Sequence, residues 1–342
     1  MLVENKWNRS FAYLASLLLG LGLIAGQAAA QYTVTNIVSN QAGKAKTQDK
    51  DLVNAWGMSF ASGGAFWISD EGTGKSTFYN GSGSKFGSVT VPTASGSGTG
   101  TPTGQVYNSS QDFQVTQGGK TGSALFIFDT LDGTISGWSP SVNSSAAVLA
   151  ATKPGAVYTG LAIGSHNGKN FIFAADVANN VVDIYNGKYK LTKSFTDTKL
   201  SGFAPYGIQN INGLLYVTFT DSTGAGVVDI FDTGGKKKGT FTKSSHLNAP
   251  WGLAMAPSNF GVMSNALLVG NFGDGKINAF DATTKKFLGA LKDGNGKTIK
   301  ISGLWALEFG QGGGNNGNPN QLFFAAGPNG EKNGLFGRID AQ

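Results

Sequence analysis

Residues 248–281 read NAPWGLAMAPSNFGVMSNALLVGNFGDGKINAFD, and this stretch shows the repeat unit of the chain most clearly. Trp251, Gly252 and Leu253 open the unit, and an apolar run follows at residues 266–269. A turn rich in Gly and Asp comes next, and the stretch ends in alternating residues at 276–280. Short runs of this kind on either side of a Gly-containing turn are typical of a β-hairpin. The unit therefore predicts two paired strands that follow a Trp-Gly-Leu segment.

The same unit recurs along the whole chain. Its marker is a Gly followed by an apolar or near-apolar pair, and copies are spaced by 45 to 56 residues. The marker positions are Gly57, Gly104, Gly160, Gly207 and Gly252, with Ala306 in the sixth copy. Periods of about 40–50 residues are those of four-stranded propeller blades. Six copies therefore predict six blades.

Each copy provides the strands of one blade, except that the last copy lacks its outer strand. The sixth copy reaches Gln342 without that strand, whereas residues 32–37 (YTVTNI) have the composition to supply it. Pairing the two ends of the mature chain would close the ring and remove an exposed sheet edge. We predict an all-β, six-bladed β-propeller of four-stranded antiparallel blades, closed by the N-terminal strand, without substantial helix after the leader. Low-complexity residues 93–103 and Gly-rich residues 311–320 are predicted to be loops.

Composition excludes several classes of site. The 342 residues include 52 Gly and no Cys, so disulfides, thiol catalysis and Cys-ligated zinc are ruled out. Only His166 and His246 are available for a His-based metal site or a catalytic triad, and we read His166 as a surface residue. The formal charge of +6 comes almost entirely from scattered Lys, whereas nucleic-acid readers rely on Arg. We expect no nucleic-acid partner.

The N-terminus has the pattern of a cleaved secretory signal. Lys6 and Arg9 precede an apolar stretch at residues 11–26, and Ala28, Ala29 and Ala30 supply a small-residue cleavage site. An uncleaved anchor is the alternative. We predict a signal peptide over residues 1–30 and one propeller domain over 31–342, exported to the periplasm or the cell exterior as a monomer without a membrane span.

Six motifs together resemble a known group of proteins. They are residues 52–57 (LVNAWG), 126–138 (FIFDTLDGTISGW), 204–210 (APYGIQN), 248–254 (NAPWGLA), 268–280 (LVGNFGDGKINAF) and 303–307 (GLWAL). With them the chain resembles a family of uncharacterised secreted bacterial propellers, related to NHL-type repeats, whose members often carry a PEP-CTERM sorting tail. No such tail is present in this sequence, so we do not expect anchoring by that route. The resemblance implies a propeller fold and export, and no settled activity.

The first candidate site consists of polar residues where the second strand of each blade ends. These are Asp70, Asp129, Asp176, Asp221 and Asn271. Their ordinary role is an Asx-turn, in which the side chain accepts hydrogen bonds from its own turn. The functional alternative is a ring of oxygen ligands for Ca²⁺ around the channel. The two alternatives differ in whether the carboxylates converge.

The second candidate site lies at the same end of the blades. It comprises Asn54, Trp56, Tyr206, Asn248, Trp251 and Trp305, which lie at or shortly before the repeat marker. These side chains serve either to pack neighbouring blades together or to line a channel mouth for a sugar or another flat polar ligand. His246 lies close to this set as a possible general base, with no partner identifiable from sequence.

Three functions fit these observations. The first is a non-catalytic exported propeller that binds a small molecule, a glycan or a protein at the channel mouth. The second is a calcium-dependent hydrolase or lactonase of the gluconolactonase kind, which rests on analogy of architecture. The third is a structural protein of the envelope or matrix. The sequence leaves catalysis undecided, since no catalytic constellation is evident, and of the cofactors Ca²⁺ alone is a candidate.

Overall fold

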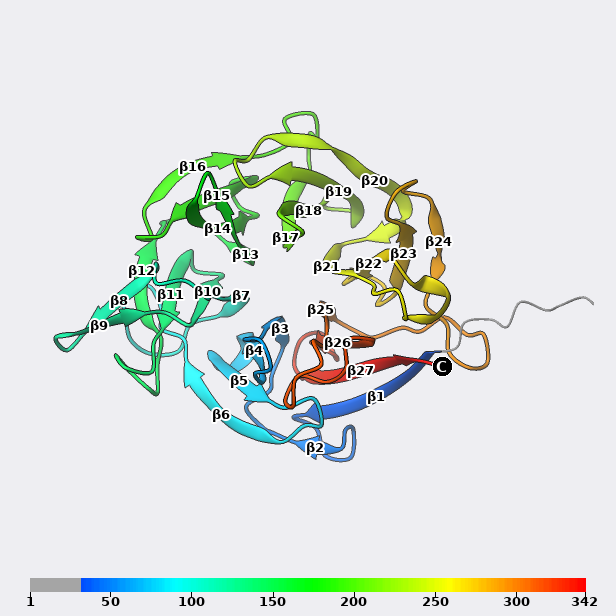
Figure 1. Cartoon of the computed structure of the whole chain (residues 1–342), viewed down its shortest axis with the longest axis horizontal. Helices are drawn as coiled ribbons and strands as arrows, with labels where there is room; N and C mark the ends of the chain where they lie inside the picture. Colours follow the sequence, from blue (N-terminus) through cyan, green and yellow to red (C-terminus); the bar gives the residue numbers. More distant parts are fainter. Residues whose placement is uncertain (1–31) are drawn as a thin grey trace, which may run out of the picture.

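Six antiparallel sheets surround a central axis in the computed structural model, which describes residues 32–342 (Figure 1). The predicted signal peptide at residues 1–30 lies outside the described residues. Each sheet contributes one blade. In five blades the strands run from the axis to the rim in chain order, and in the sixth the N-terminal strand lies outside the last strand of the chain. The predicted six-bladed, all-β propeller is confirmed. Helical structure within residues 32–342 consists of two short 3₁₀ turns, η1 (Glu71–Thr73) and η2 (Gly261–Met263).

The two strands nearest the axis form a hairpin in every blade. The innermost strands are β3 (Ala55–Ser59), β7 (Pro102–Tyr107), β13 (Tyr158–His166), β17 (Ala204–Ile211), β21 (Pro250–Met255) and β25 (Leu304–Phe309). The second strands are β4 (Phe66–Asp70), β10 (Phe126–Thr130), β14 (Lys169–Asp176), β18 (Leu214–Thr220), β22 (Ala266–Asn271) and β26 (Gln321–Ala326). We number the blades 1 to 6 in this order.

The two outer strands complete each blade. The third strands are β5 (Lys75–Tyr79), β11 (Thr134–Trp138), β15 (Val181–Asn186), β19 (Ala225–Asp232), β23 (Ile277–Asp281) and β27 (Leu335–Ala341). The outermost strands of blades 1 to 5 are β6 (Lys85–Thr90), β12 (Val148–Thr152), β16 (Leu191–Phe195), β20 (Lys237–Asn248) and β24 (Phe287–Ala290). Strand β20 extends well beyond the run predicted at residues 239–242, and the other strands lie within a few residues of the predicted runs.

The N-terminal strand closes the ring, as predicted. Strand β1 (Tyr32–Ser39) pairs antiparallel with β27, from Tyr32 opposite Ala341 to Ser39 opposite Leu335. The short strand β2 (Thr47–Gln48) adds a parallel partner on its outer side. Because β1 covers the third strand of blade 6, the first and last segments of the described chain lie in one sheet.

The repeated Gly is needed because neighbouring blades approach closely at the axis. A Cβ placed on Gly207 would lie 2.3 Å from the backbone oxygen of Trp251, and one on Gly252 would lie 2.4 Å from that of Trp305. The inner hairpins also shift register beside the marker, as between Pro205 and Ile208 in blade 4. Such a shift is the signature of a β-bulge, which bends the strand. The marker is therefore an architectural device that fits six strands around a narrow axis.

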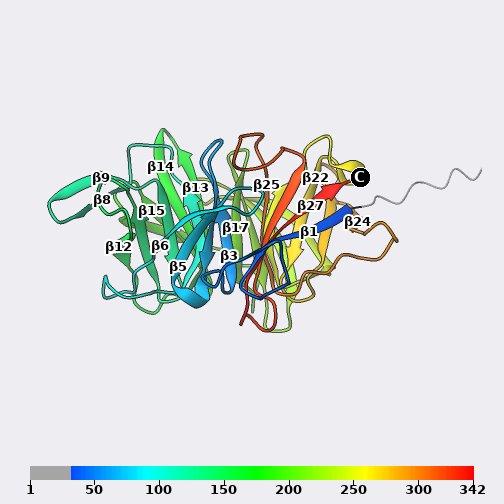
Figure 2. The ribbon, with the colours of Figure 1, turned by 90° about the horizontal axis from the view of Figure 1, so that it is seen from below.

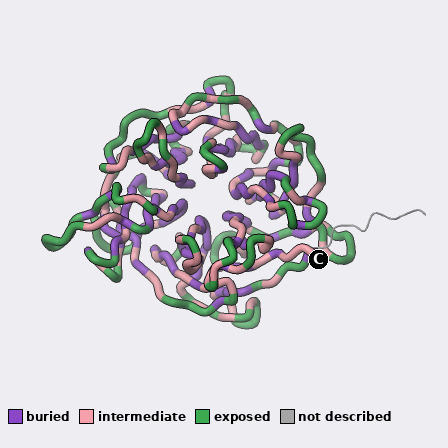
Figure 3. The backbone as a smooth tube through the Cα atoms, viewed as in Figure 1, coloured by how far each residue is buried: buried purple, intermediate pink, exposed green. Residues whose placement is uncertain are grey.

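The hydrophobic core lies between the blades. The inner strands are largely buried, whereas exposed positions gather on the outermost strands and the loops (Figure 3). One cluster joins blades 5 and 6 with Tyr32 of β1, and another joins blades 3 and 4 around Phe173, Phe219 and Phe231. Sheet-to-sheet packing of this kind makes each blade depend on its neighbours.

The short strand β2 and a hairpin on the rim were not predicted from the sequence. Strands β8 (Gln114–Gln117) and β9 (Lys120–Ser123) form a hairpin between β7 and β10, and it projects beyond the rim in both ribbon views (Figures 1 and 2). Residues 93–101 connect blades 1 and 2, and residues 311–320 connect β25 and β26, as expected. The part of the chain that is described contains no helix long and apolar enough to span a membrane.

Candidate functional site

The polar residues that end the second strands each have their own bonding partners. Most of these partners lie in the same blade, and Asp176 pairs with a Lys of the neighbouring blade. Asp70 is fully buried, and its carboxylate accepts a hydrogen bond from the backbone N–H of Thr77 at 3.0 Å. Asp129 is also fully buried and accepts hydrogen bonds from the Thr103 hydroxyl at 2.8 Å and from the backbone N–H of Gly104. Burial raises the pKa of both carboxyls, that of Asp129 to about 7. These two groups support the strands that carry them.

The other three members of this set have separate partners. Asp176 forms an ion pair with Lys153 of blade 2 at 2.9 Å. Asp221 accepts hydrogen bonds from its own turn, which lowers its pKa, and the amide of Asn271 donates to Asp274 at 3.0 Å. No group of three or more acidic or His side chains within residues 32–342 is arranged to hold a metal ion. The structure thus does not bring the predicted calcium ligands together.

The aromatic residues of the second predicted site do lie together. Trp56 and Trp305 stack with ring centroids 3.5 Å apart, and Trp251 meets both rings edge-on. Tyr206 packs against Trp305, and the Phe272 ring stacks on Trp305 with ring centroids 4.1 Å apart. We call Trp56, Tyr206, Trp251, Phe272 and Trp305 the aromatic plug. Trp56 and Trp305 are only 4% and 1% exposed, so these rings mainly contact one another at the axis.

Polar groups hold the plug in place. Asn54 is buried, accepts a hydrogen bond from Trp305 Nε1 at 3.2 Å, and donates to Glu71 at 2.9 Å and Glu331 at 3.3 Å. Its hydrogen bonds therefore link the plug to the turns of blades 1 and 6. Asn248 ends the outermost strand of blade 4 and lines a separate hollow of about 430 Å³. Asn54 and the rings thus contact one another, whereas Asn248 contacts the segment that carries Phe272 through its backbone oxygen, which accepts from Gly273 N–H at 3.1 Å.

The opposite end of the channel contains a cavity of about 260 Å³, which we call the channel cavity. Residues near the ends of the inner strands line it, and Ile163 and Met58 contribute apolar wall. Its polar lining residues are Ser59, Gln105, Tyr107, Gln209, Asn210, Glu308 and Gln311. A narrower space of about 20 Å³ continues along the axis to Trp251, with contributions from all six inner strands. The channel is thus occupied by the plug near one face and hollow near the other.

Glu308 is the one acidic residue that lines either space. It lies on β25, and its carboxylate receives one hydrogen bond from within residues 32–342, from Gln209 Nε2 at 3.4 Å. Burial away from bulk water raises its pKa to about 8. Ser59 Oγ, on the cavity wall, is buried and makes no hydrogen bond to any described residue. Strongly shifted acids in a cavity are candidates for functional residues.

The sequence contained a signal for this site that the repeat analysis did not use. Inner strands are mostly apolar after the marker, yet Gln105 lies one residue beyond Gly104, and Gln209 lies two residues beyond Gly207. Glu308 lies two residues beyond Ala306, the position that Gln209 has in its own repeat. All three residues line the spaces along the axis. A comparison of the six repeats position by position would have singled them out.

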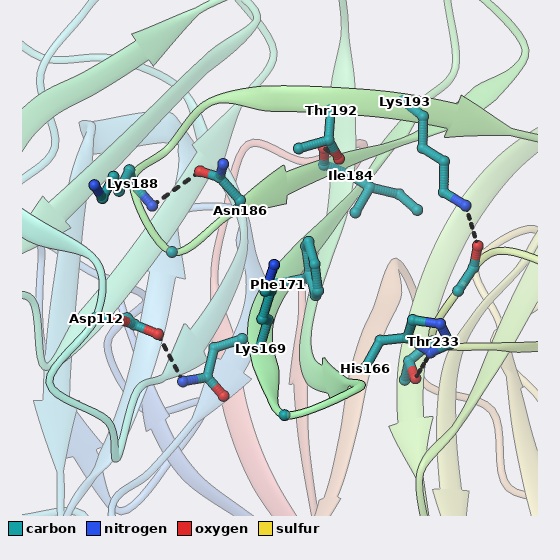
Figure 4. A pocket seen from close by; sticks show the side chains of 14 residues that line it. Asp112, His166, Lys169, Phe171, Ile184, Asn186, Lys188, Thr192, Lys193 and Thr233 are labelled. Carbon is teal, nitrogen blue, oxygen red and sulfur yellow. Dashed lines mark hydrogen bonds between the residues drawn. The ribbon is translucent and has the colours of Figure 1, made fainter.

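A larger hollow lies at the rim, away from the channel (Figure 4). It measures about 540 Å³ and lies between the outer parts of blades 3 and 4 and the segment that carries Asp112. Its polar groups bond one another: Asn170 donates to Asp112 at 2.8 Å, and Lys193 donates to the backbone oxygen of Gly234. His166 lies here beside Thr233, a rim position consistent with its interpretation as a surface residue. These paired groups explain the hollow as part of the packing between blades.

Comparison with known proteins shows the fold and leaves the family open. No family model matches the chain. An uncharacterized protein of Acanthamoeba polyphaga mimivirus is 35% identical over 224 residues, and the match spans 59% of this chain and 41% of that protein. A second uncharacterized protein of the same virus is 29% identical and matches 92% of this chain and 81% of its own length. These relatives do not support the bacterial family that the motifs resemble.

Two solved structures share the architecture. A streptogramin B lyase superposes with a TM-score of 0.54 at 12% identity, covering 92% of this chain and 98% of its own. A putative gluconolactonase gives a TM-score of 0.55 at 13% identity, with 93% of each chain covered. At these identities the likeness establishes the propeller fold alone. The fold that the resemblance implied is confirmed.

Proposed function

We propose that this protein is a propeller that binds a small molecule in the channel cavity. The observation that carries the proposal is the asymmetry of the channel, with the aromatic plug near one end and a hollow lined by polar groups near the other. A cavity of about 260 Å³ is small for a ligand pocket, for which about 300–1,000 Å³ is usual. The ligand should therefore be compact.

This location differs from the site that the sequence favoured. The predicted ligand-binding rings lie near the other end of the channel, where they contact one another and Asn54. Such rings add about 0.5–1.5 kcal/mol per pair beyond their buried area, so displacing them for a ligand would be costly. We assign the plug to stability and the channel cavity to binding.

Ser59 offers a matched pair of variants to test the site. Its hydroxyl makes no hydrogen bond to the described residues, so Ser59→Ala should leave the fold and the cavity open. Ser59→Phe places a ring in the cavity at a strand position that tolerates aromatic residues. Compounds found by a fragment screen with ligand-observed NMR should bind the parent and Ser59→Ala and lose binding to Ser59→Phe. Hits that bind Ser59→Phe equally well, or an absence of hits, would refute the proposed site.

A catalytic role is the second candidate, and Glu308 is the residue that favours it. A pKa of about 8 suits a group that exchanges protons near neutral pH. If the cavity hosts a reaction, Glu308→Gln should retain binding of a hit and lose its conversion. Lactones and esters are the first substrates to test, since a hydrolase is the alternative that the sequence analysis raised.

We also propose that the protein is exported, because its N-terminal segment has the pattern of a secretory signal. Residues 1–30 carry the charged, apolar and small-residue segments of a secretory signal. N-terminal sequencing of the protein recovered from an expressing bacterium should give a chain that starts at Gln31, in the periplasm or the medium. Recovery of a chain that starts at Met1 in the cytoplasm would contradict export.

A further inference from the structure

The environment of Glu308 determines which ligands suit the channel cavity. Strands β3, β21, β22 and β26 pack against β25, and none of them carries a titratable residue within its bounds. Across the channel, the lining contributes one titratable group besides Glu308, the hydroxyl of Tyr107. No Lys, Arg or His lines either space. An ionised Glu308 would thus be a half-buried anion without a counter-ion among the lining residues.

The remaining polar groups of the cavity can accept hydrogen bonds. Ser59 Oγ is buried and unpartnered within residues 32–342, and the side chains of Gln209 and Gln311 add amide oxygens. An anionic ligand would face Glu308 with no positive charge to offset the repulsion. A neutral polyol would find hydrogen-bond partners and leave Glu308 protonated. A cation gains most, because a half-buried carboxylate without a counter-ion is unfavourable and a positive charge beside it lowers that cost.

We propose that the channel cavity binds a compact organic ammonium ion, whose charged group contacts the Glu308 carboxylate while its apolar part lies against Met58 and Ile163. This inference rests on the proposed binding function and specifies its ligand class. An ammonium group has three donors, which match the Glu308 carboxylate and the amide oxygens of Gln209 and Gln311. The cavity volume of about 260 Å³ limits the ligand to a small amine.

Ion-pair formation in this cavity would release a proton. Glu308, whose pKa is raised by burial to about 8, is mostly protonated in the free protein at pH 7 and must ionise to pair with an ammonium ion. The ligand therefore binds the deprotonated form, and its affinity should fall about tenfold for each pH unit below 8 and level off above it. No other acidic group lines the cavity, so the pH dependence of the affinity should reflect Glu308 alone.

Three probes of one shape test the charge requirement: n-butylammonium, n-butanol and butanoate. Calorimetric titration of the parent protein at pH 6.5, 7.5 and 8.5, in two buffers of different ionisation enthalpy, measures affinity and protons released. We expect n-butylammonium to bind most tightly at pH 8.5, with release of close to one proton at pH 6.5. Glu308→Gln should weaken its binding at pH 8.5 at least tenfold and abolish the pH dependence. Glu71→Gln, which changes an acid near the plug, should leave both unchanged.

The outcomes separate the ligand class from the binding function. If butanol or butanoate binds more tightly and Ser59→Phe abolishes that binding, the channel site stands and the ammonium inference fails. If n-butylammonium binding is independent of pH, unaffected by Glu308→Gln or absent, the inference also fails. Thermal unfolding at pH 8.5 checks that Glu308→Gln is folded, and we expect its midpoint to equal or exceed that of the parent, because an amide is less costly to bury than an ionised carboxylate.

Discussion

At the scale of single residues, the distinctive groups are carboxyls buried without a cation beside them. Asp129 is fully buried, and the two hydrogen bonds that it accepts both reach the same oxygen, Oδ1. Its other oxygen is buried and makes no hydrogen bond to the described residues. Burial outweighs the two hydrogen bonds and raises the pKa of Asp129 to about 7. The folded protein therefore holds a proton that the unfolded chain would lose.

This proton predicts an unusual dependence of stability on pH. Between about pH 4 and 7 the unfolded chain releases the proton of Asp129 and the folded protein keeps it, so the free energy of unfolding falls as the pH rises. Asp129→Asn removes this effect and keeps an oxygen for Thr103 and Gly104. We expect its free energy of unfolding to exceed that of the parent by on the order of 2–4 kcal/mol at pH 8 and by much less at pH 4.5. Urea unfolding at the two pH values measures this difference.

The matched control is Asp221→Asn in blade 4. The carboxylate of Asp221 accepts hydrogen bonds from its own turn, which lower its pKa, so this variant should show no gain between pH 5 and 8. Equal gains for Asp129→Asn at pH 4.5 and pH 8 would mean that titration of Asp129 does not affect stability.

At the scale of elements, the closing strand β1 is fastened at its first residue to the neighbouring blade as well as to blade 6. The Tyr32 hydroxyl donates to the backbone oxygen of Phe260 at 3.0 Å and accepts from the backbone N–H of Met263 at 3.3 Å. Its ring is 1% exposed and packs on Phe260. Tyr32 therefore links β1 to η2 of blade 5.

Removing this hydroxyl should loosen the closure. Tyr32→Phe keeps the ring and leaves two buried backbone groups unpaired, which should lower the free energy of unfolding by about 1–3 kcal/mol. Tyr216→Phe is the control, since that residue is 8% exposed and its hydroxyl makes no hydrogen bond within residues 32–342. Denaturant unfolding measures both variants. The closure role would be wrong if the two variants lost stability equally.

The same elements show what the sequence could predict. The spacing of the markers identified the blades, because it reflects burial that repeats along the chain. The outer strand that the sixth copy lacks identified residues 32–37 as the closing strand. The β8–β9 hairpin was missed since QVTQ and KTGS contain almost no apolar residues and their pairing buries little. Periodicity reports burial, and this hairpin buries one apolar side chain, that of Val115.

The candidate site was predicted less well for a related reason. Recurrence of Trp56, Tyr206, Trp251 and Trp305 correctly indicated that these rings meet, yet recurrence selects what all blades share, which is packing. Glu308 occurs in one blade alone and gives no repeat signal. In addition, the bulge beside each marker shifts the register by a residue, and so changes which side chains face the axis.

At the scale of the whole molecule, the ring is continuous along two paths. The inner strands touch around the axis at the marker glycines, and β1 joins the last blade to the start of the described chain. Lys153 links blade 2 to blade 3 through ion pairs with two fully buried acids, Asp176 and Asp183. Removing one partner of such a pair leaves an uncompensated buried charge. Asp176, one of the acids that the sequence offered as calcium ligands, is thus already part of a connection between two blades.

This arrangement predicts the response of the whole protein to calcium. A Ca²⁺ site needs several oxygens at about 2.3–2.6 Å, and within residues 32–342 no cluster of acidic side chains offers them. A ligand at 100 times its Kd would add about 2.7 kcal/mol to the free energy of unfolding. We expect thermal unfolding of the protein in EDTA, and then in millimolar CaCl₂, to give the same midpoint, with MgCl₂ as the ionic-strength control. A calcium-specific rise that Asp176→Ala abolishes would restore the metal-dependent hydrolase. It would mean that the cation displaces Lys153 from the buried carboxylates, because Asp176 is otherwise occupied by this ion pair.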